Sequence, residues 1–182
     1  EETEKIYFDV IKNVQSEIKI PIAVKTSPYF TNLGQMLQKL SETDISALVL
    51  FNRFWSPDFD IENFNILSSH VLSTPGELST SLRWIAIMAN RVKSDLAAST
   101  GIHDGRAVVK QLLAGANAVQ VASTLYRNGF PRIQKMLDEV EEWMNQHNFN
   151  NIDDFRGKMS QSESDDPAAF ERVQFMKYFS GK

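Results

Sequence analysis

Two short turns in the second half of the chain have the residue types of an anion-binding site. Thr100, Gly101 and Ile102 follow one apolar run and lead toward a predicted helix, and Ala122 and Ser123 follow the next apolar run. Glycine lets the backbone approach an anion closely, and free amides at the start of a helix bind phosphate. The two turns predict a phosphate site, although the first also fits an ordinary strand-to-helix turn.

The elements that position these turns follow from the pattern of apolar residues. Four short apolar runs are the predicted strands: residues 20–25, 47–51, 96–99 and 118–122. Short runs without polar alternation are typical of parallel strands that helices cover on both faces. Helical periodicity predicts helices over residues 4–17, 33–40, 81–93, 104–114, 131–147 and 166–179. Gly115 is the expected C-cap of the fourth helix, and Pro131 suits the first turn of the fifth.

Strand and helix alternate four times, which predicts an α/β fold of βαβ units with right-handed crossovers. An open doubly wound sheet and half of a closed barrel both fit four such units. The region at about 52–80 interrupts the alternation and is rich in Ser, Pro, Asn and Asp. Within this insertion, residues 64–67 and 70–73 are predicted to pair as a small β-hairpin.

Several segments resemble the dihydroorotate dehydrogenases. The segment IPIAVKTSPYF (residues 20–30) resembles the strand-five motif of that family. Residues 98–129 resemble its flavin-phosphate region across strands seven and eight, and residues 155–160 are similar to the segment after the last barrel helix. The LFNRF loop (residues 50–54) and the DPAAFER tail (residues 166–172) are similar to a less characterised dihydroorotate dehydrogenase-like branch.

This resemblance implies the C-terminal half, units five to eight, of a (β/α)8 TIM barrel. Residues 1–182 would then form a single partial domain from which strands one to four are absent. In the family, the catalytic base is a cysteine or serine in the first half of the barrel, and no residue here matches it. The chain is therefore expected to carry no catalytic residue and to be inactive alone.

The resemblance also implies FMN as the cofactor. Its expected cofactor-binding residues are Lys25, Ser79, Thr80, Ser99, Thr100, Gly101, Ala122 and Ser123. Lys25 would stabilise negative charge on the reduced flavin, and Asn52 and Arg53 would contact substrate. Four of these residues also have a purely structural interpretation. Lys25 fits a solvated surface lysine, Asn52 fits a turn or capping asparagine, and Ser79 and Thr80 fit helix N-caps.

Three positions depart from the family pattern. The family often has a glycine pair at Thr100-Gly101, Gly-Thr at Ala122-Ser123, and a small hydroxyl residue at Arg53. Backbone amides remain available at the first two positions. An arginine beside the substrate changes which anion is preferred, and so bears on whether dihydroorotate is the substrate.

Composition excludes several other kinds of site. The chain has no cysteine, which excludes disulfides, thiolate metal sites and a cysteine nucleophile. Its formal net charge is −4 with scattered Lys and Arg, so neither a nucleic acid nor a membrane is an expected partner. None of the three histidines has metal-ligand spacing, and no metal is predicted. The expected location is the cytoplasm.

The function that the resemblance implies belongs to the parent protein: an FMN-dependent oxidoreductase that converts dihydroorotate to orotate in pyrimidine biosynthesis. Two alternatives remain open. The chain is a barrel enzyme that binds a phosphorylated metabolite without flavin, or an inert half barrel that associates with itself. Because strands at both ends of a half barrel lack partners, we expect a homo-oligomer or pairing with the missing N-terminal half.

Overall fold

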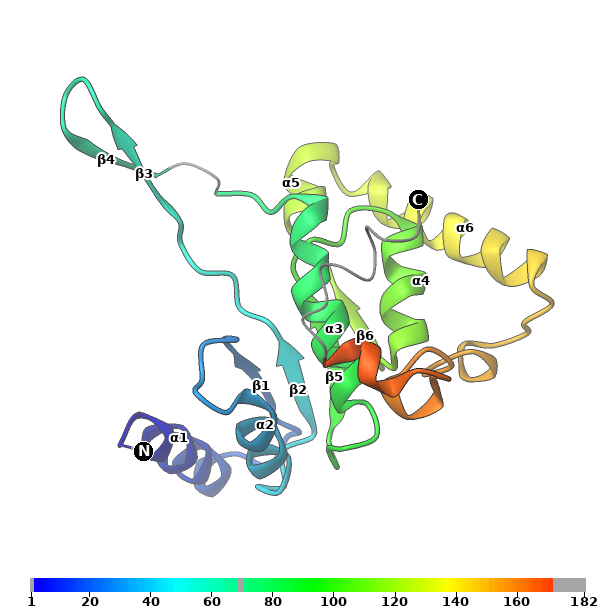
Figure 1. The fold of residues 1–182 in the computed structure, drawn as a ribbon, viewed down its shortest axis with the longest axis horizontal. Helices are drawn as coiled ribbons and strands as arrows, with labels where there is room; N and C mark the ends of the chain where they lie inside the picture. Colours follow the sequence, from blue (N-terminus) through cyan, green and yellow to red (C-terminus); the bar gives the residue numbers. More distant parts are fainter. Residues whose placement is uncertain (1, 69–70, 172–182) are drawn as a thin grey trace.

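A four-stranded parallel sheet forms the framework of the protein (Figure 1). The computed structural model describes residues 2–68 and 71–171. The strands are β1 (Ala23–Thr26), β2 (Ala47–Leu50), β5 (Asp95–Ser99) and β6 (Ala118–Gln120), and they lie in the order β1-β2-β5-β6. All three pairings are parallel, which confirms the predicted α/β fold.

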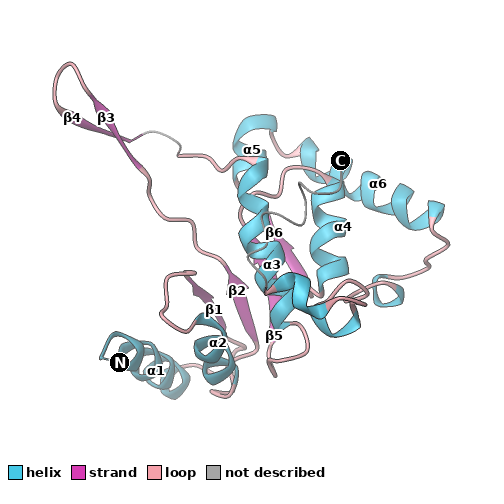
Figure 2. Cartoon of the chain, viewed as in Figure 1, coloured by secondary structure: helices cyan, strands magenta, loops and turns pink. Residues whose placement is uncertain are grey.

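The described residues contain six α-helices, of which α2, α3 and α4 connect successive strands of the sheet and pack on it (Figure 2). They are α1 (Glu2–Glu17), α2 (Leu33–Ser41), α3 (Leu78–Met88), α4 (Gly105–Ala114), α5 (Ser123–Asn128) and α6 (Pro131–Gln146). Short 3₁₀ helices are η1 (Pro75–Glu77), η2 (Ile152–Asp154), η3 (Gln161–Glu163) and η4 (Pro167–Phe170).

Most predicted helices are confirmed; two need correction, and one helix was not predicted. Helix α3 was expected over residues 81–93 but begins at Leu78 and ends at Met88. Helix α5 was not predicted, because six residues are too few to show helical periodicity. The last predicted helix, over residues 166–179, begins as the 3₁₀ helix η4, and its part beyond residue 171 lies outside the described residues.

The core forms where α2 and α3 pack on the central strands. Leu48 and Leu50 of β2 are fully buried, together with Leu37 of α2 and Ile85 of α3. Gln111 of α4 is a fully buried polar side chain. Its Nε2 donates to Ser81 Oγ at 2.9 Å, and this hydrogen bond links α4 to α3.

The insertion contains a hairpin that projects away from the sheet (Figure 1). Strand β3 (Pro57–Asp60) pairs antiparallel with β4 (Asn65–Ser68), so the predicted pairing of residues 64–67 with 70–73 is wrong. The Asp60 carboxylate accepts hydrogen bonds from the backbone N–H groups of Glu62 and Asn63 at 3.0 and 3.1 Å. This local Asx turn fixes the reversal at residues 61–64 and therefore the pairing.

A substitution of Gly115 tests how tightly the end of α4 packs against the end of α3. Its φ is 115°, and an added Cβ would lie 2.5 Å from the Cβ of Ala89. We expect Gly115→Ala to lower the free energy of unfolding by more than about 1 kcal/mol, because both the backbone and the contact are unfavourable. Urea denaturation followed by circular dichroism measures the change. Gly76→Ala is the matched control, since nothing lies within 4 Å of its added Cβ; an equal loss in both variants would contradict the interpretation.

Candidate functional site

A pocket of about 250 Å³ opens at the carboxyl ends of the four parallel strands. Because parallel strands end at the same edge of a sheet, residues that follow β1, β2, β5 and β6 meet there. The lining residues are Lys25, Asn52, Arg53, Val71, Ser73, Ser99, Thr100, Gly101, Ile102, Gln120, Val121, Ala122 and Ser123. All but two of the residues expected from the sequence to bind cofactor or substrate are among them.

The exceptions are Ser79 and Thr80, which were also considered as N-caps. Both are exposed and lie in the first turn of α3, which begins at Leu78, so neither caps the helix. Thr80 lines a neighbouring pocket of about 230 Å³ that also touches Asn52. Ser79 lines neither pocket, and its hydroxyl donates to the Gly76 carbonyl oxygen at 3.1 Å.

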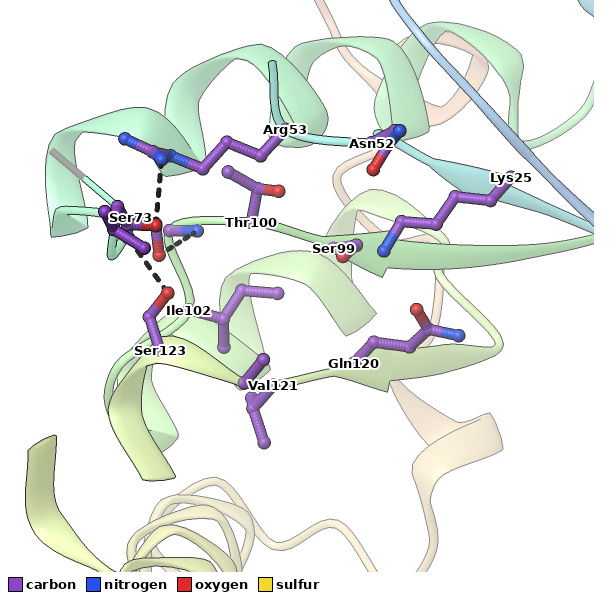
Figure 3. Close-up of a pocket in the computed structure, with 13 residues that line it drawn as sticks. Lys25, Asn52, Arg53, Ser73, Ser99, Thr100, Ile102, Gln120, Val121 and Ser123 are labelled. Carbon is purple, nitrogen blue, oxygen red and sulfur yellow. Dashed lines mark hydrogen bonds between the residues drawn. The ribbon is translucent and has the colours of Figure 1, made fainter. Parts of the chain in front are cut away.

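The charges of the first pocket favour an anion. Among its lining residues the charged side chains are Lys25 and Arg53, both cationic, and the pocket also carries several hydroxyl groups. Figure 3 shows Lys25 and Gln120 toward one end of the pocket and Ser73 and Ser123 toward the other. Lys25 is exposed and makes no ion pair with any described residue. Its charge is therefore free to act on a ligand.

The turn after β5 has an unusual backbone conformation. Thr100 and Gly101 both lie in the left-handed region, with φ of 80° and 77°. A Cβ at Gly101 would collide with the backbone N of Leu78, so glycine is required where the turn packs on the start of α3. Thr100 Oγ1 donates to the Phe51 carbonyl oxygen at 3.2 Å, which helps to hold this residue in a conformation that glycine usually takes.

Ser73 joins the two turns, and the sequence did not single it out. Its backbone N–H donates to Ser123 Oγ at 2.9 Å, and its own Oγ accepts from the Gly101 N–H at 3.4 Å. The signal that the sequence offers is the capping box at Thr74 and Glu77, because the Glu77 carboxylate accepts the Thr74 N–H at 2.6 Å. That pattern starts the helical segment at Pro75 and leaves Ser73 at the end of the preceding loop.

An ion pair joins the two ends of the insertion. Arg53 Nε lies 2.7 Å from Glu77 Oε1, and Arg53 Nη1 donates to the Val71 carbonyl oxygen at 3.1 Å. Burial tends to raise the pKa of Glu77, but hydrogen bonds from Thr74 and the Arg53 guanidinium outweigh it, so the pKa lies below its ordinary value. The carboxylate therefore stays charged and keeps Arg53 in place.

His103 is adjacent to Ser73, and its Nε2 lies 3.2 Å from Ser73 Oγ. Burial lowers the pKa of its imidazole, and the Arg127 guanidinium lowers it further. In the sequence, His103 has no metal-ligand spacing and no assigned role, and the structure shows a half-buried ring within hydrogen-bond distance of a pocket residue.

Two further findings concern the described residues as a whole. No group of three or more His, Asp or Glu side chains is arranged there to hold a metal ion. None of the helices in the described ranges is long and apolar enough to cross a bilayer.

The fold and the site together define a class of protein: α/β barrels that bind ligands at the carboxyl ends of their strands. Residues 1–144 match the family described as dihydroorotate dehydrogenase. Because that match covers most of the sequence, the chain belongs to the dihydroorotate dehydrogenase family.

Curated relatives agree with this family. The chain is 24% identical over 152 residues to the dihydroorotate dehydrogenase B (NAD(+)) catalytic subunit of Thermoplasma volcanium, with 82% of this chain and 50% of that protein covered. It is 27% identical over 154 residues to the protein of the same description from Geobacter sp. strain M21, with 83% and 50% covered. The chain thus spans about half the length of the curated relatives it matches.

A solved structure shows the same fold. The crystal structure of DHODH in complex with ferulenol from Eimeria tenella matches with a TM-score of 0.67 at 20% identity. The match covers 85% of this chain and 48% of that chain. The four strands and their helices therefore correspond to part of a TIM barrel, as the resemblance implied.

The Arg53–Glu77 ion pair leads to a pH prediction. A lowered folded-state pKa adds stability that is present above the unfolded pKa, about 4.3 for Glu, and is lost as pH falls through the folded value. We expect Glu77→Gln to reduce hydrogen-exchange protection of residues 71–77 at neutral pH. The wild-type protein should approach the variant only in acid.

Glu62→Gln is the matched control, because Glu62 is exposed in the hairpin turn and makes no ion pair with any described residue. Protection factors measured by mass spectrometry decide the question. Equal protection in wild type and Glu77→Gln across the pH range would show that the ion pair does not hold the insertion.

Proposed function

We propose that this chain supplies the FMN-phosphate site and part of the substrate site of an oxidoreductase that converts dihydroorotate to orotate. The observation that carries the proposal is the pocket at the ends of β5 and β6, whose charged lining residues are both cationic. Family membership supports the same activity. The oxidoreductase activity belongs to the whole protein, which we place in the cytoplasm and in pyrimidine biosynthesis.

The residues of the pocket fit the phosphate end of FMN. Small-molecule pockets commonly measure about 300–1,000 Å³, so a volume of about 250 Å³ suits a phosphate and the adjoining chain better than a whole flavin. Ser73, Gly101 and Ser123 gather at one end, where the hydroxyl protons of the two serines would be donated to the phosphate. The flavin ring would then extend toward Lys25, at the more open end.

Lys25 and Asn52 have complementary roles in this proposal. When bound, FMN supplies hydride transfer, and the Lys25 ammonium would balance negative charge on the ring. The Asn52 side chain, with two donors and one acceptor, would hold a planar imide or carboxylate substrate. Asn52 is exposed, so further groups outside the described residues are needed to enclose the substrate. The catalytic base is expected on the other half of the barrel.

Arg53 has a different position from Asn52. Its guanidinium is already paired with Glu77 and turns toward the Ser73 end of the pocket (Figure 3). A paired arginine offers less net charge to a substrate than a free one. We therefore assign Arg53 first to holding the insertion, and its contact with substrate stays a prediction. Pairing of this chain with a second copy or with the other half of the barrel is part of the same proposal.

A second candidate function keeps the pocket and changes the ligand. The small volume of the pocket also fits a phosphorylated metabolite in a barrel enzyme without flavin. An inert, self-associating half barrel would bind neither. FMN, riboflavin and inorganic phosphate distinguish the three, because riboflavin carries the same ring without the phosphate.

The decisive experiment measures the affinity of the full-length gene product, and of this chain, for FMN and riboflavin by quenching of flavin fluorescence, and for inorganic phosphate by isothermal titration calorimetry. We expect FMN to bind at least about tenfold more tightly than riboflavin, since charge-assisted hydrogen bonds to the phosphate are lost in riboflavin. Phosphate binding without flavin binding would support the second candidate. Failure to bind any of the three would leave the inert half barrel.

A substitution of Lys25 tests its proposed role in the full-length protein. We expect Lys25→Met to lower the reduction potential of the bound flavin by about 30 mV or more, the equivalent of a tenfold change for a two-electron couple. Titration against a redox dye measures the potential. Lys39→Met is the control, because Lys39 is exposed near the end of α2 and lines neither pocket. An unchanged reduction potential in Lys25→Met would show that Lys25 does not act on the flavin.

A further inference from the structure

We infer that Ser73 is a positioning residue for the bound anion, and that His103 sets the direction in which Ser73 donates its hydroxyl proton. The inference rests on the proposed function in one respect, since it takes the anion to be the phosphate of FMN. It adds a proton-sensitive pair, from the insertion and from the turn after β5, to a site otherwise built by the turns after β5 and β6.

The position of Ser73 supports a role at the anion. The residue is 4% exposed, although it belongs to the long insertion, and it lines the pocket. Hydrogen bonds connect it to Ser123 on one side and to Gly101 on the other, so it spans the two turns (Figure 3). Loss of these bonds would let the turns separate.

The hydrogen-bond capacity of Ser73 then limits what it can do. A serine hydroxyl has one proton to donate and two lone pairs that accept. The Gly101 N–H occupies one lone pair, and His103 Nε2 lies 3.2 Å from the same oxygen. If Nε2 carries no proton, the hydroxyl proton must point to the ring. If Nε2 carries a proton, it takes the second lone pair, and the hydroxyl proton is left for an anion.

Three hydrogen bonds to the carbonyl oxygen of His103 fix the backbone of this residue beside the pocket. Its carbonyl oxygen accepts from Arg132 Nε and Nη2 at 3.0 and 2.7 Å and from Thr124 Oγ1 at 3.2 Å. These three bonds come from α5 and α6 and fix the backbone behind the pocket. The contact between Nε2 and Ser73 Oγ then places the imidazole beside the hydroxyl.

The charges around His103 make this pair responsive to a ligand. Burial and then Arg127 lower the pKa of the ring, while the hydrogen bond with Ser73, Asp104 and Glu77 act to raise it. Arg132, which is hydrogen-bonded to the His103 carbonyl oxygen and ion-paired with Glu139, and Arg53, which is ion-paired with Glu77, are further charged groups at this end of the pocket. A dianion at Ser73 would add negative charge on the pocket side. Anion binding and protonation of His103 should then favour each other by equal factors.

The first test measures the pKa of His103 by NMR in the full-length protein, with and without inorganic phosphate. The chain has three histidines, and His103→Gln identifies which signal belongs to His103. Sulfate serves as a second probe, because its charge does not change during the titration. We expect both anions to raise the pKa, and Ser73→Ala to reduce that rise. Bound anion without any change in the pKa would overturn the inference.

The second test compares affinities for FMN and riboflavin. We expect Ser73→Ala to weaken FMN binding about tenfold and to leave riboflavin binding unchanged, because the lost hydrogen bond goes to a charged group. Ser73→Thr keeps the hydroxyl and should restore the preference. Ser16→Ala is the matched control, since Ser16 is an exposed serine of α1 that lies outside the pocket. His103→Gln keeps a side-chain donor but should lose the pH dependence that His103 contributes.

The outcomes separate the inference from the function on which it rests. If the wild-type protein binds FMN and riboflavin equally, the proposed function fails and the inference fails with it. If the wild type prefers FMN and Ser73→Ala keeps that preference, the inference alone is wrong. Should Ser73→Ala fail to fold, the NMR titration of the wild-type protein still decides, because it requires no substitution at Ser73.

Discussion

Parallel pairing of the strands is the constraint on which the site depends. Because β1, β2, β5 and β6 all run in one direction, their carboxyl ends lie along one edge of the sheet. Residues as far apart in the sequence as Lys25 and Ser123 therefore meet in one pocket. The burial of Leu48 and Leu50 beneath α2 and α3 keeps that edge in register. The chemistry of the pocket is thus a consequence of packing elsewhere in the core.

The sheet alone does not fix the shape of the pocket. The turns after β5 and β6 reach their places through side-chain contacts: Gly101 fits against the start of α3, and Ser73 bonds to both turns. These contacts come from a segment that belongs to no strand of the main sheet. The shape of the proposed anion site therefore depends on the packing of the insertion as well as on the turns after β5 and β6.

Much of the fold was predictable from the sequence, because strands and long helices leave a periodic signal. The four strands, α4 and the left-handed Gly115 follow from local patterns. The start of α3 and the hairpin register were missed because each depends on short polar contacts, at Thr74 and Asp60, that leave no apolar periodicity. The position of Ser73 was missed because it depends on contacts with residues far apart in the chain. The residues of the two turns were singled out by their types and by a family resemblance, whereas the role of Ser73 follows only from its hydrogen bonds in the structure.

The hairpin that projects from the sheet is closed at its base by Arg53, which holds both Val71 and Glu77. Strands β3 and β4 lie beyond these contacts of Arg53, so substitutions in the two strands need not alter the pocket. Doubling the length of a flexible loop with fixed ends costs only about 0.6 kcal/mol in closure entropy. The length of the loop between Arg53 and Val71 can accordingly change at little cost in closure free energy, while the contacts of Arg53 at its base are kept.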